Sequence, residues 1–100
     1  MMYAFTQDVP IDAAAHQRIM DELGPKAPEG LVAHVVSVRP EGGLRYLDVW
    51  TSKEACDRFV EDRLHPVVHA MLAQVFGDDL PPEPARELVD VVAVWTPQEA

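Results

Sequence analysis

Residues 31–50 decide the fold of this chain, and they read LVAHVVSVRPEGGLRYLDVW. The first half, 31–39, is rich in β-branched residues and predicts a strand. Pro40-Glu41-Gly42 then fits a three-residue hairpin loop, a type I turn that is closed by a glycine with positive φ. Residues 43–50 return as the second strand. The stretch therefore predicts an antiparallel hairpin.

The residues ahead of the hairpin predict a strand followed by a helix. We expect the strand over 2–7. Pro10 suits the first turn of the helix, and Asp12 favours its positive end. Apolar residues then recur at helical spacing until Gly24-Pro25 stops the helix.

The residues after the hairpin predict an interrupted helix. Thr51 fits an N-cap, with Glu54 completing a capping box. Pro66 has no N–H to donate, and it disfavours helical geometry at His65, so we expect one helix to end near Leu64 and another to begin with His65 as its cap. His69 would then lie one turn inside the new helix, without His65 beside it. We therefore predict no zinc or iron site.

The complete order of elements is βαββαβ, with a last strand expected over 88–95. This order predicts a single α+β domain over residues 1–100, with the ferredoxin-like arrangement of an antiparallel sheet and two helices on one face. Both faces of the predicted strands are largely apolar, as the alternation of Val36 and Val38 with Ala33 and Val35 illustrates. The face without helices needs another covering layer, most economically a second copy, so we expect a homodimer.

The composition narrows the class of protein. The chain has 100 residues, a net charge of −9 and a pI near 4.6, so nucleic acid and anionic membranes are excluded as partners. No run approaches the ~18 apolar residues of a membrane span. The start of the chain has no secretory pattern, and the single cysteine, Cys56, fits a reducing compartment. We expect a soluble, cytoplasmic protein.

The hairpin register brings polar and aromatic side chains onto one face of the sheet. If Arg39 faces Gly43, the pairing opposes Val36 to Tyr46, His34 to Asp48, and Val32 to Trp50. A carboxylate fixes the tautomer of a neighbouring histidine and strengthens it as a general base. The alternative is a buried polar pair whose only role is to satisfy itself.

Three further side chains stand out by their position on predicted helices. Arg63 lies in the apolar stripe, where it either anchors an anionic ligand or pairs with Asp48 or an acidic loop. His16 is interpreted as a partly buried histidine that is satisfied by Asp12, one turn earlier. Cys56 is interpreted as a small buried apolar residue rather than a nucleophile.

The βαββαβ order, the run of GLRYLDVW into TSKEACDRFVEDRL and the broken second helix resemble the dimeric α/β-barrel superfamily, in particular its antibiotic-biosynthesis-monooxygenase-like domains. The resemblance covers nearly the whole chain and is strongest over 31–76. It implies a homodimer whose two sheets form a barrel, with a cavity between sheet and helices in each subunit. Members include cofactor-free oxygenases of aromatic polyketides, haem-degrading oxygenases and small proteins with no known reaction.

The haem-degrading branch can be compared residue by residue. Its iron-ligating histidine falls on His69, but its catalytic tryptophan is replaced by Phe59. Both this branch and the branch of cofactor-free oxygenases, which form quinones, use an asparagine, and this chain contains none. The quinone-forming branch also uses a tryptophan, for which Trp50 is available.

We therefore expect a cavity protein that acts on a small apolar or aromatic molecule by cofactor-independent monooxygenase-like chemistry. A non-catalytic small-molecule-binding dimer is the alternative, and haem binding through His69 is the third hypothesis. The expected catalytic residues are His34, Asp48 and Arg63, and the expected substrate-binding residues are Tyr46, Trp50, Phe59 and His69.

Overall fold

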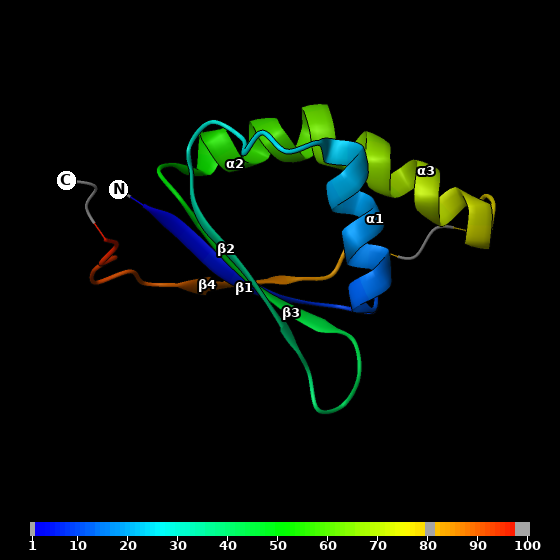
Figure 1. Cartoon of the computed structure of the whole chain (residues 1–100), viewed down its shortest axis with the longest axis horizontal. Coiled ribbons are helices and arrows are strands. Elements are labelled where there is room, and N and C mark those ends of the chain that lie inside the picture. The colour runs from blue at the N-terminus through cyan, green and yellow to red at the C-terminus, as the bar shows by residue number, and fades with distance from the viewer. Residues whose placement is uncertain (1, 80–81, 98–100) are drawn as a thin grey trace.

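The chain folds as a four-stranded sheet with helices on one of its faces (Figure 1). A computed structural model describes residues 2–79 and 82–97. The elements are β1 (Tyr3–Val9), α1 (Ala13–Leu23), β2 (Leu31–Val38), β3 (Leu44–Trp50), α2 (Lys53–Phe59), the π-helical turn η1 (Val60–Leu64), α3 (His65–Phe76) and β4 (Arg86–Val89).

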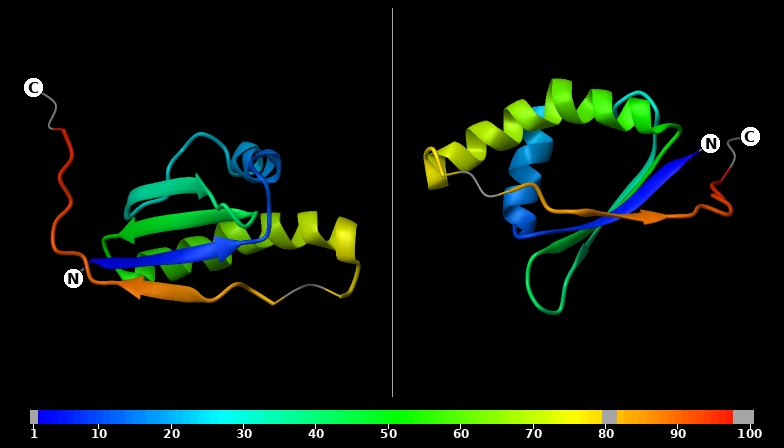
Figure 2. Two further views of the ribbon diagram at one scale, coloured as in Figure 1. Left: turned by 90° about the horizontal axis from the view of Figure 1, so that it is seen from below. Right: turned by 180° about the vertical axis from the view of Figure 1, so that it is seen from behind.

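The sheet has the order β2-β3-β1-β4, and every neighbouring pair is antiparallel. The four strands lie side by side in Figure 2, with α2, η1 and α3 running behind them as one long helical segment. This arrangement confirms the predicted α+β architecture and is compatible with a ferredoxin-like fold.

The hairpin register is confirmed through its central part. His34 lies opposite Asp48, and Val36 lies opposite Tyr46. The loop closes with a hydrogen bond from the Arg39 N–H to the Gly43 carbonyl at 3.1 Å. The register fails only at the far end, where a bulge between Leu31 and Ala33 places Leu31, not Val32, opposite Trp50.

The starts of two helices differ from the sequence prediction. β1 extends to Val9, so Pro10 lies outside α1 rather than in its first turn. Asp12 is the N-cap and accepts a hydrogen bond from the Ala15 N–H at 2.8 Å. At the start of α2 the cap is Ser52, not Thr51. The Thr51 N–H is bound to the Gly30 carbonyl at 2.8 Å, so it is not free for the side chain of Glu54 as the predicted capping box requires.

The predicted boundary in the second helical segment is confirmed, since η1 ends at Leu64 and Pro66 lies in the first turn of α3. The predicted break with His65 as a cap is wrong, because the helical segment is continuous. His65 has helical backbone angles (φ −57°, ψ −44°) although it precedes Pro66. The chain absorbs the proline by widening the preceding turn, so that the His65 N–H bonds to the Val60 carbonyl five residues back. η1 therefore joins α2 to α3 without interruption.

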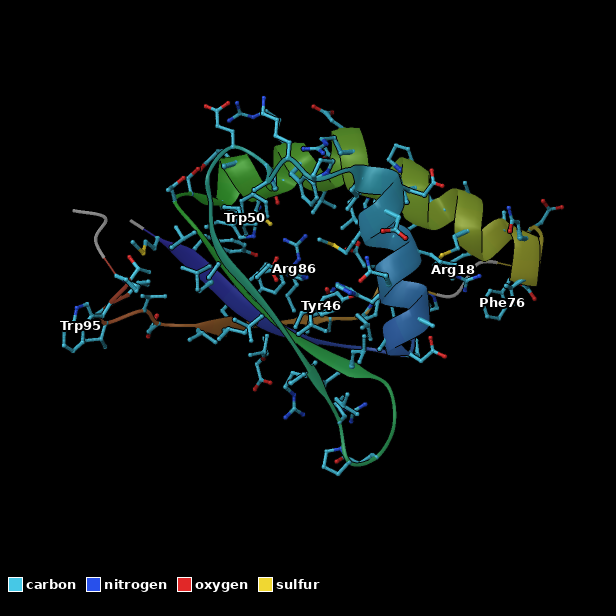
Figure 3. The ribbon with its side chains drawn as sticks, in the orientation of Figure 1. Arg18, Tyr46, Trp50, Phe76, Arg86 and Trp95 are labelled. Carbon is cyan, nitrogen blue, oxygen red and sulfur yellow. The ribbon has the colours of Figure 1, made fainter. Side chains whose placement is uncertain are left out.

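The last strand is shorter than predicted. β4 spans Arg86–Val89, and Val89 pairs with Ala4 near the start of β1. Residues after Val89 have almost no partner strand left, because β1 itself begins at Tyr3. They leave the sheet, and Trp95 is 98% exposed at the end of this segment (Figure 3).

The core lies where β1 and β3 meet α2 and η1. Phe5, Trp50, Cys56 and Val60 form one buried cluster, in which Trp50 is 1% exposed. Full burial of each large apolar side chain stabilises the fold by roughly 1.5–3 kcal/mol. Cys56 is fully buried, as expected, and this burial raises the pKa of its thiol.

The sheet face opposite the helices carries exposed apolar side chains. Val35 and Leu47 are paired on this face and are 51% and 36% exposed. Val89 adds to the same face from β4 and is also exposed. Among the described residues, no helix is long and apolar enough to cross a membrane.

Candidate functional site

A cavity of about 360 Å³ lies between the sheet and the helices. Its walls come from the inner face of the sheet, from α1, from η1 and α3, and from the loop 24–28. Most of the lining is apolar, and polar side chains enter it both from the sheet and from the helices and loops. Tyr46, Trp50 and Arg86 are seen in Figure 3 between the sheet and the helices. Small-molecule pockets commonly have roughly 300–1,000 Å³ and this mixture of surfaces.

All seven residues proposed from the sequence line this cavity. The β2–β3 hairpin supplies His34, Tyr46, Asp48 and Trp50, and the second helical segment supplies Phe59, Arg63 and His69. The structure thus brings the proposed residues together, and their roles remain predictions.

The predicted pair of His34 and Asp48 is present. Nδ1 of His34 lies 2.5 Å from Oδ1 of Asp48. The other oxygen of Asp48 accepts a hydrogen bond from the indole N–H of Trp50 at 3.2 Å. The indole only donates, so this oxygen of Asp48 is an acceptor. When Asp48 is ionised it accepts from His34 as well, and His34 then carries a proton on Nδ1.

His16 extends this pair into a chain of three side chains. Its Nε2 lies 3.3 Å from Nε2 of His34, and the two rings are stacked with centroids 5.6 Å apart. The predicted pairing of His16 with Asp12 is wrong, since the Asp12 carboxylate caps α1 at Ala15 instead. Burial, and then the neighbouring His34, lower the pKa of His16.

Tyr46 packs edge-on against both histidines. Its ring centroid lies 4.9 Å from that of His34 and 5.5 Å from that of His16. Burial, together with the negative charge of Asp48, raises the pKa of Tyr46 to about 12. Tyr46 is therefore a neutral phenol at physiological pH and is able to donate a hydrogen bond to a ligand.

Arg63 has a different partner from those expected. It donates a hydrogen bond to the carbonyl of Leu23, the last residue of α1, at 2.9 Å. Its guanidinium also lies over the Phe59 ring, 5.5 Å from the centroid. The expected pairing with Asp48 or an acidic loop is therefore wrong. Arg63 ties α1 to η1 at the cavity wall and keeps further N–H groups for a ligand.

Arg86 is a cavity residue that the sequence analysis missed. Its guanidinium lies 4.8 Å from the Phe5 ring centroid, and Nη1 donates to the Tyr3 hydroxyl at 3.2 Å. The same nitrogen lies 3.6 Å from a carboxylate oxygen of Asp57. The sequence predicts the last strand from Leu88, where its apolar run begins, and leaves Arg86 outside it. Extending the alternation two residues back would have placed it on the inner face.

His65 and His69 lie side by side at the cavity, contrary to the prediction. Their rings stack with centroids 5.0 Å apart and an interplanar angle of 12°, which the unbroken helix permits. Nε2 of His65 also lies 3.6 Å from a carboxylate oxygen of Glu83. Within residues 2–79 and 82–97, His, Cys, Asp and Glu side chains form no group of three that is suited to a metal ion.

Comparison of the sequence with protein-family models gives no match, and comparison with curated proteins gives none either. Among solved structures, the chain is similar to Rv0793 from Mycobacterium tuberculosis, with a TM-score of 0.58 and 18% sequence identity. The alignment covers 95% of this chain and 98% of that chain. At this identity the similarity concerns the fold alone, so function has to be argued from the site.

Proposed function

We propose that this protein carries out cofactor-independent, monooxygenase-like chemistry on a small aromatic molecule that is held in the cavity. The observation that supports this most directly is a hydrogen-bonded carboxylate–imidazole pair, Asp48 and His34, in the wall of a cavity whose lining is mostly apolar. Oxygenation without a cofactor begins by removing a proton from the substrate, because the resulting carbanion or phenolate is what reacts with oxygen. A mostly apolar cavity with a carboxylate–imidazole pair in its wall suits this removal of a proton.

The developing negative charge has nearby partners. Tyr46 offers a phenolic O–H on the same wall, and Arg63 carries a permanent positive charge across the cavity. Donors that are already in place where charge develops stabilise it without reorganisation. Phe59, whose ring packs on the buried Trp50 with centroids 5.6 Å apart, provides an apolar wall for an aromatic ring.

The proposal includes membership of the antibiotic-biosynthesis-monooxygenase-like group and a dimer. The uncovered apolar face around Val35 and Leu47 supports the dimer, as does the exposed segment that ends near Trp95. A second copy on this face would bury more than the roughly 1,600 Å² of a standard interface. The chain departs from the oxygenases of that group in having no asparagine, and we assign the base to a histidine of the cavity instead.

Non-catalytic ligand binding is the second candidate function. It is favoured by the hydrogen bonds at His34, both of whose ring nitrogens already have protein partners. Haem binding through His69 is less well supported. A cavity of about 360 Å³ lies at the lower end of small-molecule pockets, which favours a ligand of two or three rings over a macrocycle.

Oxygen uptake with anthrone, without any added cofactor, tests the proposal. Anthrone is a flat aromatic ketone with an acidic CH₂ group. We expect wild-type protein to consume oxygen above the spontaneous rate, and His34→Gln to lose at least tenfold of this excess. Saturable binding of anthrone with no oxygen uptake would support the binding module instead. A Soret band on haemin titration that is lost in His69→Ala would support haem binding.

A further inference from the structure

His34 has no free nitrogen with which to take a proton from a substrate. Its Nδ1 is bound to Asp48 at 2.5 Å and its Nε2 faces Nε2 of His16 at 3.3 Å. A general base needs a lone pair that the substrate can reach. Within the site of the proposed function, the base that contacts the substrate must therefore be sought one residue further along the chain of hydrogen bonds.

The donors and acceptors along the chain fix the tautomers of both rings. Asp48 is an acceptor, so His34 in its neutral form has its proton on Nδ1 and a lone pair on Nε2. That lone pair requires a proton on Nε2 of His16. The neutral His16 ring then has its lone pair on Nδ1.

Nδ1 of His16 is the end of the chain that remains open. It makes no hydrogen bond to any residue that the structure describes, and it is not completely buried. His16 lines the cavity, and its ring packs against Tyr46. α1 holds it in place through the Asp12 cap at one end and the bond from Arg63 at the other.

We propose that His16 is the catalytic base, with Nδ1 as the atom that removes the substrate proton, and that His34 and Asp48 are positioning residues that draw the proton away. This assignment rests on the proposed function, because it names the base of that same site. It also changes the role of His34, which no longer contacts the substrate.

The proton balance of the step is simple. The C–H or O–H bond of the substrate breaks, its electron pair stays on the substrate, and the proton binds Nδ1 of His16. The proton on Nε2 of His16 then moves to Nε2 of His34. The positive charge ends on the ring beside the Asp48 carboxylate instead of facing the apolar cavity, where an unpaired charge is costly. No oxidation or reduction occurs in this step.

The environment of His16 agrees with this role. Its burial and the neighbouring His34 lower its pKa, so the ring is neutral at physiological pH and able to accept a proton.

Long-range ¹H–¹⁵N NMR of the wild-type protein tests the arrangement without any substrate. At a pH where both rings are neutral, we expect the Nδ1–H tautomer for His34 and the Nε2–H tautomer for His16. An Nδ1–H tautomer at His16 would overturn the proposal, because the nitrogen open to the substrate would then hold a proton instead of a lone pair.

Hydrogen–deuterium exchange at the CH₂ group of anthrone, followed by mass spectrometry in oxygen-free D₂O, tests the base itself. We expect the protein-catalysed exchange to fall at least 100-fold in His16→Gln and to recover in part when imidazole is added to His16→Ala. Gln17→Ala, an exposed neighbour on α1, serves as the control for disturbance of the helix and should exchange like wild type.

The outcomes separate the two proposals. Normal exchange in His16→Gln, with oxygen uptake intact, would overturn the role of His16 and leave the proposed function standing. Wild-type protein that neither exchanges nor takes up oxygen would overturn the proposed function, and the base role with it. Loss of exchange without imidazole rescue in a folded His16→Ala would mean that His16 is only structural, and would also overturn the assignment.

Discussion

Replacement of Asp48 by asparagine tests the hydrogen-bonded chain at its charged end. The carboxylate accepts one bond from His34 and one from Trp50. Asparagine has one oxygen and one NH₂ group, so only one of these donors keeps an acceptor. Trp50 is 1% exposed and cannot turn its N–H to water, so the oxygen stays with Trp50. The NH₂ group then faces His34, which must move its proton from Nδ1 to Nε2.

The expected loss of stability follows from this exchange of partners. A charge-assisted hydrogen bond, worth about 1.5–3 kcal/mol, is replaced by a neutral one worth about 0.5–1.5 kcal/mol. We expect Asp48→Asn to lower the free energy of unfolding by about 1–2 kcal/mol, which corresponds to roughly 4–16 °C in the melting temperature of a domain of this size. Asp48→Ala should be less stable still, because it leaves the buried indole N–H without an acceptor.

Thermal unfolding followed by circular dichroism, at one protein concentration, measures the order of stability of wild type, Asp48→Asn and Asp48→Ala. Asp8→Asn is a suitable control, since Asp8 is an exposed carboxylate that pairs with Arg45 at the surface, and it should melt close to wild type. Equal melting temperatures for wild type and Asp48→Asn would refute the reasoning, because the carboxylate would then contribute no more than an amide. Equal values for Asp48→Asn and Asp48→Ala would refute the claim that Trp50 retains the oxygen.

Three further predictions concern the rest of the domain. Gly30 and Gly24 have nearly the same φ, +88° and +87°, but a Cβ would lie 2.6 Å from Ala55 Cβ at Gly30 and in open space at Gly24. In urea unfolding, Gly24→Ala should lower the free energy of unfolding by about 1–2 kcal/mol, and Gly30→Ala should lower it by about 1–3 kcal/mol more. Equal losses would contradict the contact at Gly30. The pKa of Tyr46 is about 12 in the folded protein and about 10 in the unfolded chain, so the free energy of unfolding should fall as pH rises from 10 to 12. Tyr46→Phe should abolish this part of the loss. Val35→Asp should dissociate or unfold the proposed dimer, and a wild-type monomer at micromolar concentration in sedimentation would contradict it.

The central hairpin could be predicted because local rules determine it. A short loop that ends in glycine fixes the register, and the register alone places His34 opposite Asp48. The same rules fail at the start of β2, because the bulge after Leu31 depends on how the strand meets the preceding loop. The length of β4 could not be predicted either, since its end is determined by where β1 runs out of residues to pair with.

The partner of His16 was missed because two interactions compete for one carboxylate. Asp12 lies one turn before His16, which makes the local pairing plausible, but the same side chain is also the best cap for α1. Once Asp12 caps the helix, the histidine is left to find a partner on another element. That partner, His34, is brought near only when α1 packs over the sheet.

The wide turn η1 has a consequence for how cavities of this fold can diverge. A π-helical turn contains one residue more than an α-helix needs. The widened turn takes up that residue, so α3 keeps the face toward the cavity that it would have in an uninterrupted α-helix. Deleting one residue from 60–64 would restore α-helical geometry and leave His65 and His69 facing the cavity. The wide turn could thus be gained or lost by a single insertion or deletion while this wall of the cavity stayed unchanged.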